Sequence, residues 1–243
     1  MSARKVAFRA AQLWRIVASR PVLVTSRTDM AIAFFDLDGT ITHRDTLFPL
    51  VLRLLVRRPL RLLRLLGVIP AVARYAFKRD RGALKQSLLR ATLRGVSRAE
   101  VAAVSERFVA DTIARRCFQD ALAAIRRHRD AGHHLVLMSA SVDFYVPMFA
   151  EQLGFDQVIS TGVRWDGDRL DGTLTSANRR GEEKARCFKA LIDERGDANT
   201  YAYGNSDSDL PHLRLARHGV LVNGSVVARR AAVALGVATV EWI

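Results

Sequence analysis

Short apolar runs, each followed by polar residues and then by a helical pattern, recur along the chain from residue 31 onward. Strands are predicted at residues 31–35, 134–138, 157–160, 200–203, 219–222 and 238–243. Continuous apolar runs of this kind are typical of strands that are buried on both faces. Because strands that alternate with helices form a parallel sheet covered on both sides, we expect an α/β fold with a Rossmann-like, doubly wound parallel sheet.

One long segment departs from this alternation. Residues 46–113 contain helical patterns divided by glycines and prolines, without a strand signal. We expect them to form a helical domain inserted after the first strand, with residues 30–45 and 114–243 forming the α/β core. Within the core, Asp166-Gly167 predicts a hairpin turn. Residues 1–29 form a basic leader without the apolar region of a secretory signal, and we expect a poorly ordered extension.

The positive charge is concentrated in this insert. The chain has a net charge of +14, and residues 44–98 alone carry 14 basic and 2 acidic side chains. Such a local excess indicates a surface or pocket that meets something anionic. Few aromatic residues accompany these charges, whereas single-stranded nucleic-acid binders use aromatic side chains for stacking. We therefore expect no nucleic-acid partner.

Composition excludes several classes of protein. A hydrophobic content of 49% excludes a disordered chain. No run of about 18 apolar residues occurs, so no segment resembles a transmembrane helix. The two cysteines, Cys117 and Cys187, are too few for a disulfide framework, and reduced thiols are typical of a cytoplasmic protein.

Polar side chains follow several of the predicted strands. Asp36 and Asp38 come after the first strand, and Ser139 after the second. Lys184 begins a later helix, and Asp209 follows the strand at residues 200–203. Ligands of such sheets bind outside the carboxyl ends of the strands, so we expect these groups to converge. This set of side chains suits a divalent cation and a phosphoryl group.

The segment Asp36-Leu37-Asp38-Gly39-Thr40 is the sharpest of these signals. Mg²⁺ takes one or two carboxylates together with substrate phosphate and water, and it would keep Asp36 ionised as a nucleophile. Asp38 is then a candidate for protonating the leaving oxygen and later deprotonating water. Gly39 permits a tight turn. The structural alternative is that Asp38 only forms an Asx-turn or caps a helix.

Four segments in the expected order resemble the motifs of the haloacid dehalogenase superfamily of phosphatases and phosphotransferases. They are residues 34–40, 135–139, 181–184 and 203–210. The resemblance implies that Lys184 neutralises the charge of the phosphate and of the nucleophile. It also implies two sets of ligands. The phosphoryl group is bound by Thr40, Ser139, the backbone at Ala140, and Lys184, and Mg²⁺ is held by Asp36, Asp38, Asn205 and Asp209.

Two points in these motifs are specific to this chain. The family pattern has an aspartate where this chain has Asn205, whose carboxamide ligates through oxygen but brings no charge, so Mg²⁺ affinity is expected to fall. Asp207 is an alternative source of charge, although the spacing favours Asp209. We expect Ser141 to cap a helix that begins near Asp143, which leaves Ser139 free for the anion.

The position of the insert resembles that of the helical cap in subfamily IB, which includes phosphoserine phosphatase. Such a cap covers the site, excludes water and selects substrate. The resemblance implies that Asp45, at the position of a glutamate that reads the substrate amine, faces the substrate, and we add Arg81 as a second candidate on the cap side. The apolar, arginine-bearing insert more closely resembles the bacterial phosphatidylglycerophosphatase C type.

Two interpretations of residues 47–77 stay open. Arg53, Arg57, Arg61 and Arg64 would form one stripe on a helix among leucines, although Pro59 predicts a division into two helices. A basic amphipathic segment of this kind lies in a membrane interface and attracts anionic lipid. Alternatively, the leucines pack on the core and the arginines face solvent or phosphate.

These observations predict a Mg²⁺-dependent enzyme that hydrolyses a phosphate monoester through a phospho-aspartyl intermediate. A phospholipid head-group phosphate such as phosphatidylglycerophosphate is the leading substrate, and phosphoserine and histidinol phosphate are soluble alternatives. A catalytically weak module that binds membranes is the alternative from another class. We expect a cytoplasmic protein, peripheral at the inner face of the membrane if the lipid interpretation holds.

Overall fold

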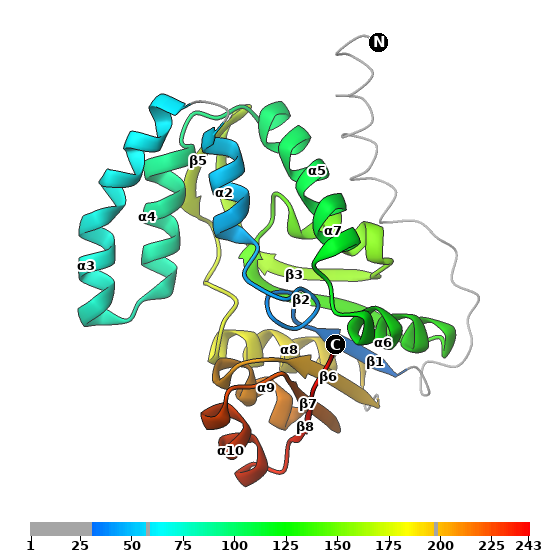
Figure 1. Ribbon diagram of the computed structural model, residues 1–243. Coiled ribbons are helices and arrows are strands. Elements are labelled where there is room, and N and C mark those ends of the chain that lie inside the picture. Colours follow the sequence, from blue (N-terminus) through cyan, green and yellow to red (C-terminus); the bar gives the residue numbers. More distant parts are fainter. Residues whose placement is uncertain (1–30, 57–58, 197–198) are drawn as a thin grey trace, which may run out of the picture.

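The computed structural model describes residues 31–56, 59–196 and 199–243, with no side-chain description for residues 59–61. The predicted extension at residues 1–29 lies outside the described part. A six-stranded parallel sheet in the order β3-β2-β1-β6-β7-β8 forms the centre of the core (Figure 1). Its strands are β1 (Ile32–Phe35), β2 (His134–Val142), β3 (Gln157–Thr161), β6 (Thr200–Gly204), β7 (His218–Val222) and β8 (Ala238–Val240).

Helices cover both faces of this sheet. One face packs against α6 (Gln119–Asp130) and α7 (Val146–Leu153), and the other against α8 (Glu182–Arg195), α9 (Leu210–Leu215) and α10 (Val226–Ala234). Side chains of β1 alternate between the two cores, with Phe35 in the first and Phe34 in the second. Both phenylalanines are completely buried. The predicted α/β fold with a doubly wound parallel sheet is confirmed.

The strand order explains why the predicted site residues converge. β1 lies between β2 and β6, and Phe35 is paired with Leu137 on one side and Tyr203 on the other. All three strands are parallel, so the loops that follow them leave the sheet at the same edge. Asp36 follows β1 and therefore lies in the middle of this edge, between the loops that follow β2 and β6.

The insert after β1 contains helices throughout the part that is described. It begins with α2 (Leu47–Val56) and continues with a 3₁₀ helix, η1 (Pro59–Val68), and with α3 (Ile69–Lys78), α4 (Arg81–Leu93) and α5 (Arg98–Arg115). The predicted division at Pro59 is confirmed. The segment after Pro59 is helical as expected, and it winds as a 3₁₀ helix with about three residues per turn. The α-helical spacing assumed for the arginine stripe therefore does not apply along η1, where Arg64 lies, and Arg57 and the side chain of Arg61 lie outside the described part.

The predicted hairpin is present and packs against the insert. Strands β4 (Val163–Asp166) and β5 (Arg169–Leu174) form a separate antiparallel sheet. The backbone N–H of Gly95 donates to Leu170 O at 2.8 Å, and that of Arg98 donates to Asp168 O at 2.7 Å. Gly172 lies so close to α4 that a Cβ atom there would be 2.9 Å from the backbone nitrogen of Arg90. The division into core and insert stays a prediction, and the hairpin that we expected in the core contacts the insert.

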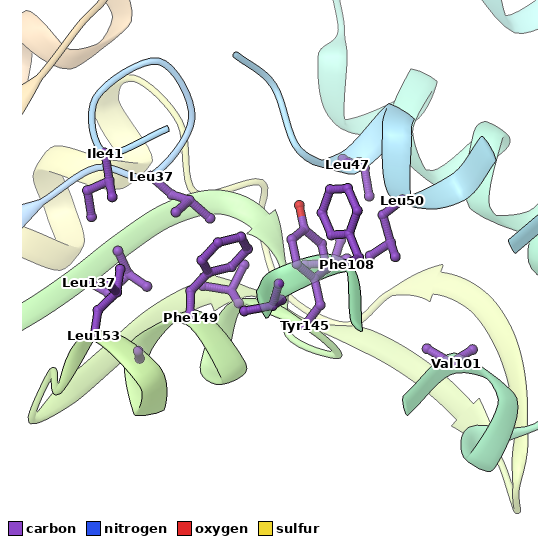
Figure 2. Packing of buried hydrophobic residues seen from close by; sticks show 14 of the residues in the cluster. Leu37, Ile41, Leu47, Leu50, Val101, Phe108, Leu137, Tyr145, Phe149 and Leu153 are labelled. Carbon is purple, nitrogen blue, oxygen red and sulfur yellow. The ribbon is translucent and has the colours of Figure 1, made fainter. Parts of the chain in front are cut away.

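An apolar cluster joins the beginning of the insert to the core. Figure 2 shows Tyr145 and Phe108 next to Leu47 and Leu50 of α2, with Phe149 of α7 beyond them. Tyr145, Leu50 and Phe149 are completely buried. This packing fixes the start of the insert relative to the sheet edge.

The end of β2 differs from the prediction. The strand does not stop at Ser139 but continues to Val142, and α7 begins only at Val146 with no side-chain hydrogen bond at its N-cap. The predicted start of this helix at Asp143 and its cap at Ser141 are therefore wrong, whereas its end at Leu153 is as predicted. None of the helices in residues 31–56, 59–196 and 199–243 is long and apolar enough to cross a membrane.

Candidate active site

The loop after β1 turns tightly around Asp36. Backbone N–H groups of residues 40, 41 and 42 all donate to Leu37 O, at 3.3, 2.9 and 3.0 Å. Gly39 makes this turn possible with a φ of +82°, and a Cβ atom there would lie 2.1 Å from Asn205 Nδ2. The hydroxyl of Thr40 donates to Asp36 Oδ2 at 3.2 Å. The loop thus holds the Asp36 carboxyl group at the sheet edge and packs directly against Asn205.

Lys184 connects two of the predicted carboxylates. It lies in the first turn of α8, and its Nζ donates to Asp36 Oδ1 at 2.7 Å and to Asp209 Oδ1 at 2.8 Å. All three side chains are buried, with Lys184 only 2% exposed. Burial alone lowers the pKa of Lys184, but the charges of Asp209 and Asp36 outweigh burial and raise it. Lys184 is therefore a permanently charged ammonium between two carboxyl groups.

The two carboxyl groups have different environments. Asp209 Oδ2 accepts from Ser206 N, Asn205 N and Ser206 Oγ at 3.1, 3.2 and 2.7 Å. Burial opposes the ionisation of Asp209, but Lys184 and these hydrogen bonds hold its pKa below the usual range. Asp36 has fewer donors, and burial raises its pKa to about 7 although Lys184 acts in the opposite direction. Asp36 is therefore the carboxyl group that most needs an additional cation in order to stay ionised.

Asp38 is held by residues that the sequence analysis did not identify. Its Oδ1 accepts from Thr46 N at 2.7 Å and from Thr46 Oγ1 at 2.6 Å, and its Oδ2 accepts from Ser141 Oγ at 2.7 Å. The Tyr145 hydroxyl lies 2.8 Å from Thr46 Oγ1. Burial raises the pKa of Asp38, whereas the bonds from Ser141 and Thr46 oppose that rise. A raised pKa suits a carboxyl group that has to hold a proton before it donates it.

The predicted phosphate-binding residues lie at different depths. Ser139 is completely buried, its Oγ accepts from Ser141 N at 3.0 Å, and it does not line the cavity described below. Thr40 is also completely buried and is bonded to Asp36. Ala140 and Ser141 do line the cavity. Ser141 bonds Asp38 rather than a helix terminus because β2 continues three residues beyond Ser139.

A cavity of about 570 Å³ lies between the sheet edge and the insert. Asp36, Asp38, Lys184, Asn205 and Asp209 line it from the core. The predicted residues Asp45 and Arg81 line it as well. Asp45 Oδ1 accepts from Phe48 N at 3.1 Å, so this side chain also caps the N-terminus of α2.

The donor atoms around the cavity fit Mg²⁺. Oxygen ligands are available from the Asp36 carboxylate, the main chain of Asp38 and the carboxamide of Asn205. Asp209, the fourth predicted ligand, also lines the cavity, and both of its carboxylate oxygens accept hydrogen bonds. No group of three or more His, Cys, Asp and Glu residues in the described ranges is arranged as a metal site. Mg²⁺ does not require such a group, because it keeps several waters and takes oxygens from substrate phosphate. Asp207 is exposed and does not line the cavity.

The chain is similar to known proteins over most of its length. The chain is 33% identical over 202 residues to Protein CicA of Caulobacter vibrioides, which covers 82% of this chain and 89% of the relative. It is 26% identical over 200 residues to phosphoserine phosphatase SerB1 of Mycobacterium tuberculosis, covering 79% and 65% of the two chains. A solved structure of a Bordetella pertussis Tohama I protein of unknown function aligns with a TM-score of 0.71 and 24% identity, over 88% of this chain and 99% of the other.

The family profile for haloacid dehalogenase-like hydrolases matches residues 33–214, which include all four motifs. The family predicted from those motifs and its enzyme class are thereby confirmed. The chain belongs to the haloacid dehalogenase-like hydrolase family.

Proposed function

We propose that this hydrolase is a Mg²⁺-dependent phosphatase that cleaves phosphate monoesters through a phospho-aspartyl intermediate on Asp36. The observation that carries the proposal is the buried arrangement of Asp36, Lys184 and Asp209 beside Asp38 at one end of the cavity. Burying three carboxyl groups and one ammonium does not stabilise a packed core, whereas phosphoryl transfer needs this combination of charged groups. The phosphoserine phosphatase name of a 26% identical relative supports the same reaction class.

In the first step, a carboxylate oxygen of Asp36 attacks phosphorus while the bond to the leaving oxygen breaks. Lys184, which already donates to Asp36, balances the negative charge that accumulates on the transferring group. Asp38 donates its proton to the leaving oxygen, so that the product leaves as a neutral alcohol. Thr40 keeps the Asp36 carboxylate in one rotamer through its 3.2 Å hydrogen bond.

In the second step, the now ionised Asp38 accepts a proton from a water molecule. This water attacks the phosphorus atom, and the bond between phosphorus and the Asp36 oxygen breaks to regenerate the carboxylate. Thr46 and Ser141 hold Asp38 at the cavity wall for both proton transfers. A bound Mg²⁺, held by Asp36, the main chain of Asp38, Asn205 and Asp209, would supply positive charge that keeps Asp36 ionised and offsets the phosphate charge.

The test compares the wild type with Asp36→Asn in the hydrolysis of p-nitrophenyl phosphate. We expect turnover that requires Mg²⁺, is lost in EDTA, and falls by at least about 10³-fold in the variant, because the nucleophile is gone. Asp207→Asn is the matched control, since Asp207 is exposed and outside the cavity. Equal activity of the wild type and Asp36→Asn would contradict the proposal.

The substrate class has two candidates, which differ in whether the insert meets a membrane. The insert, proposed as a cap at residues 46–113, exposes apolar side chains along α2, η1 and α3. More than half of the surface of each of these side chains is exposed: Phe48, Val56, Leu63, Leu66, Ile69, Val72 and Phe77. Together with the basic charge of the segment, this surface favours a lipid-linked phosphate at an anionic membrane, encountered from the cytoplasm.

Other observations favour a soluble phosphate. The guanidinium of Arg53 is engaged within the protein, where it pairs with Asp111 at 2.8 Å and lies 5.3 Å from the centre of the Phe108 ring. Arg57 and the side chain of Arg61 lie outside the described part. The two candidates are separated by sedimentation with phosphatidylcholine vesicles, with and without phosphatidylglycerol. If the lipid candidate holds, Leu66→Ser with Phe77→Ser abolishes vesicle binding, and the control Val227→Ser on α10 does not.

A further inference from the structure

The charged side chains that line the cavity form two sets. The first set comes from the core and contains the acidic residues and Lys184 described above. The second set comes from α4, from the segment between β5 and α8 and from the residues just before α2. Its cationic residues are Arg44, Arg81, Lys85 and Arg180, and its acidic residue is Asp45. A simple phosphate monoester, whose alcohol part is small and neutral, has no second group that could bind these cations.

One face of α4 is directed at the cavity. The helix contributes Arg81, Leu84, Lys85 and Leu88 to the lining, a spacing of three and four residues that defines one side of a helix. The leucines suit the carbon skeleton of a substrate, and the two cations flank them. This face is therefore built for a ligand that has both apolar and anionic parts.

Lys85 is a half-buried cation of this second set. Its Nζ donates to Ala140 O, next to the predicted phosphate site, and to Asn178 Oδ1 at 2.5 Å. An ammonium has three N–H donors, and both of these acceptors are uncharged. Within the described residues, no carboxylate pairs with Lys85. A partly buried cation with only neutral partners is costly, and an anion bound beside it offsets that cost.

The neighbouring charges support the same conclusion. Burial lowers the pKa of Lys85 to about 8; Asp38 and Asp45 oppose this change, and Arg180 contributes to it. The guanidinium groups of Arg81 and Arg180 form no ion pair within residues 31–56, 59–196 and 199–243. Arg179, in contrast, is already paired with Glu183. Arg81, Lys85 and Arg180 thus line the cavity without an ion-pair partner among the described residues.

Resting on the phosphatase function proposed above, we infer that the substrate carries a second anionic group, a carboxylate or a phosphodiester, and that Lys85 binds it together with Arg81 and Arg180. The scissile phosphate lies at Asp36 and the second anion beside α4.

The test uses two soluble phosphate monoesters that differ only in the oxidation state of one carbon. 3-Phosphoglycerate has a carboxylate where glycerol 3-phosphate has an uncharged CH₂OH group. We expect the wild type to prefer 3-phosphoglycerate in kcat/KM by at least about 10-fold, because a charge-assisted hydrogen bond contributes that much. In Lys85→Met this preference falls to about 2-fold or less, and Lys85→Arg retains most of it. Lys189→Met, at an exposed position of α8, keeps the wild-type ratio.

The ratio separates recognition from a structural role. If Lys85 only fastens α4 to Ala140 and Asn178, Lys85→Met slows both compounds equally, and the inference is overturned. It is also overturned if the wild type shows no preference. A further pair, glycerophosphoglycerol phosphate and its diacyl form in detergent, distinguishes a soluble phosphodiester from a lipid head group. Preference for the diacyl form assigns the second anion to a lipid.

Failure of the proposed function gives a different result. If no phosphate monoester is turned over, the phosphatase proposal fails, and the affinity of Asp36→Asn for 3-phosphoglycerate and glycerol 3-phosphate still tests the anion site. Calorimetry that shows tighter binding of 3-phosphoglycerate, lost in the double variant with Lys85→Met, supports the site. Equal affinities overturn it.

Discussion

Replacing Thr46 by valine tests how Asp38 is prepared for proton transfer. Thr46 is 3% exposed, so the change from hydroxyl to methyl keeps the shape of a packed site. It removes the 2.6 Å hydrogen bond to Asp38 Oδ1 and leaves the 2.7 Å bond from the Thr46 backbone in place. A hydrogen bond to a charged group contributes about 1.5–3 kcal/mol, which corresponds to a loss of roughly 10- to 150-fold in rate.

The size of this loss depends on the leaving group. An alkyl phosphate needs a proton from Asp38 as its oxygen leaves, whereas p-nitrophenolate leaves with little assistance. We therefore expect the full loss in kcat for glycerol 3-phosphate and a much smaller one for p-nitrophenyl phosphate. Without the Thr46 hydroxyl, the pKa of Asp38 rises further, so the alkaline limb of the pH–rate profile, where this acid loses its proton, moves to higher pH.

Thr46→Ser is the matched control, because it retains the hydroxyl and is expected to recover most of the rate. Thermal unfolding of each variant separates a catalytic effect from a loss of stability, since the Tyr145 hydroxyl also loses its partner at Thr46. Equal losses for the two substrates, or a Thr46→Ser enzyme as slow as Thr46→Val, would refute the role assigned to Asp38.

Three further changes test the metal site and the turn. Asn205→Asp adds a charged ligand, so the Mg²⁺ concentration for half-maximal turnover should fall; an unchanged titration removes Asn205 from the ligands. Gly39→Ala places a Cβ atom 2.1 Å from Asn205 Nδ2 at a φ of +82°, and we expect at least a 10-fold loss of kcat/KM with a lower melting temperature, whereas wild-type values would contradict the close contact. In EDTA, raising the pH from about 4 through the Asp36 pKa of about 7 ionises a carboxyl group that the folded state prefers protonated. Stability is therefore lost on the alkaline side, so the melting temperature of Asp36→Asn minus that of the wild type should increase over this interval, and a constant difference would contradict the assigned pKa.

The central part of the site was predictable because it depends on topology. Asp36 and Asp209 follow neighbouring parallel strands, and Lys184 begins the helix that leads to one of them, so any fold with this alternation brings the three together. The order of the motifs was sufficient to predict the sheet and the family. What the motifs could not predict is which hydroxyl contacts Asp38.

Ser141 shows why. Its sequence position suits a helix cap, and only the continuation of β2 to Val142 turns its hydroxyl toward Asp38. Thr46 reaches Asp38 because α2 packs on Tyr145 and its neighbours, which is a tertiary contact without a local signal. A threonine eight residues after Asp38, where the insert begins, is the only trace of it in the sequence.

The insert was the least predictable part for the same reason. A leucine- and arginine-rich segment indicates helices, but it does not determine which face packs inward. The 3₁₀ winding of η1 gives the described side chains from Leu62 to Val68 other directions than an α-helix would. The hairpin β4–β5 packs closely on the α4 backbone at Gly172. The position of Lys85 in the cavity follows from this docking.

The most direct measurement traps the covalent intermediate. Wild-type enzyme is quenched during turnover of a phosphate monoester with Mg²⁺, reduced with borohydride, digested and analysed by mass spectrometry. Because an acyl phosphate is reduced to an alcohol, the expected product is homoserine at position 36, absent without substrate and absent in Asp36→Asn. Turnover without any reduced residue at position 36, or with the product at another carboxylate, would contradict the mechanism.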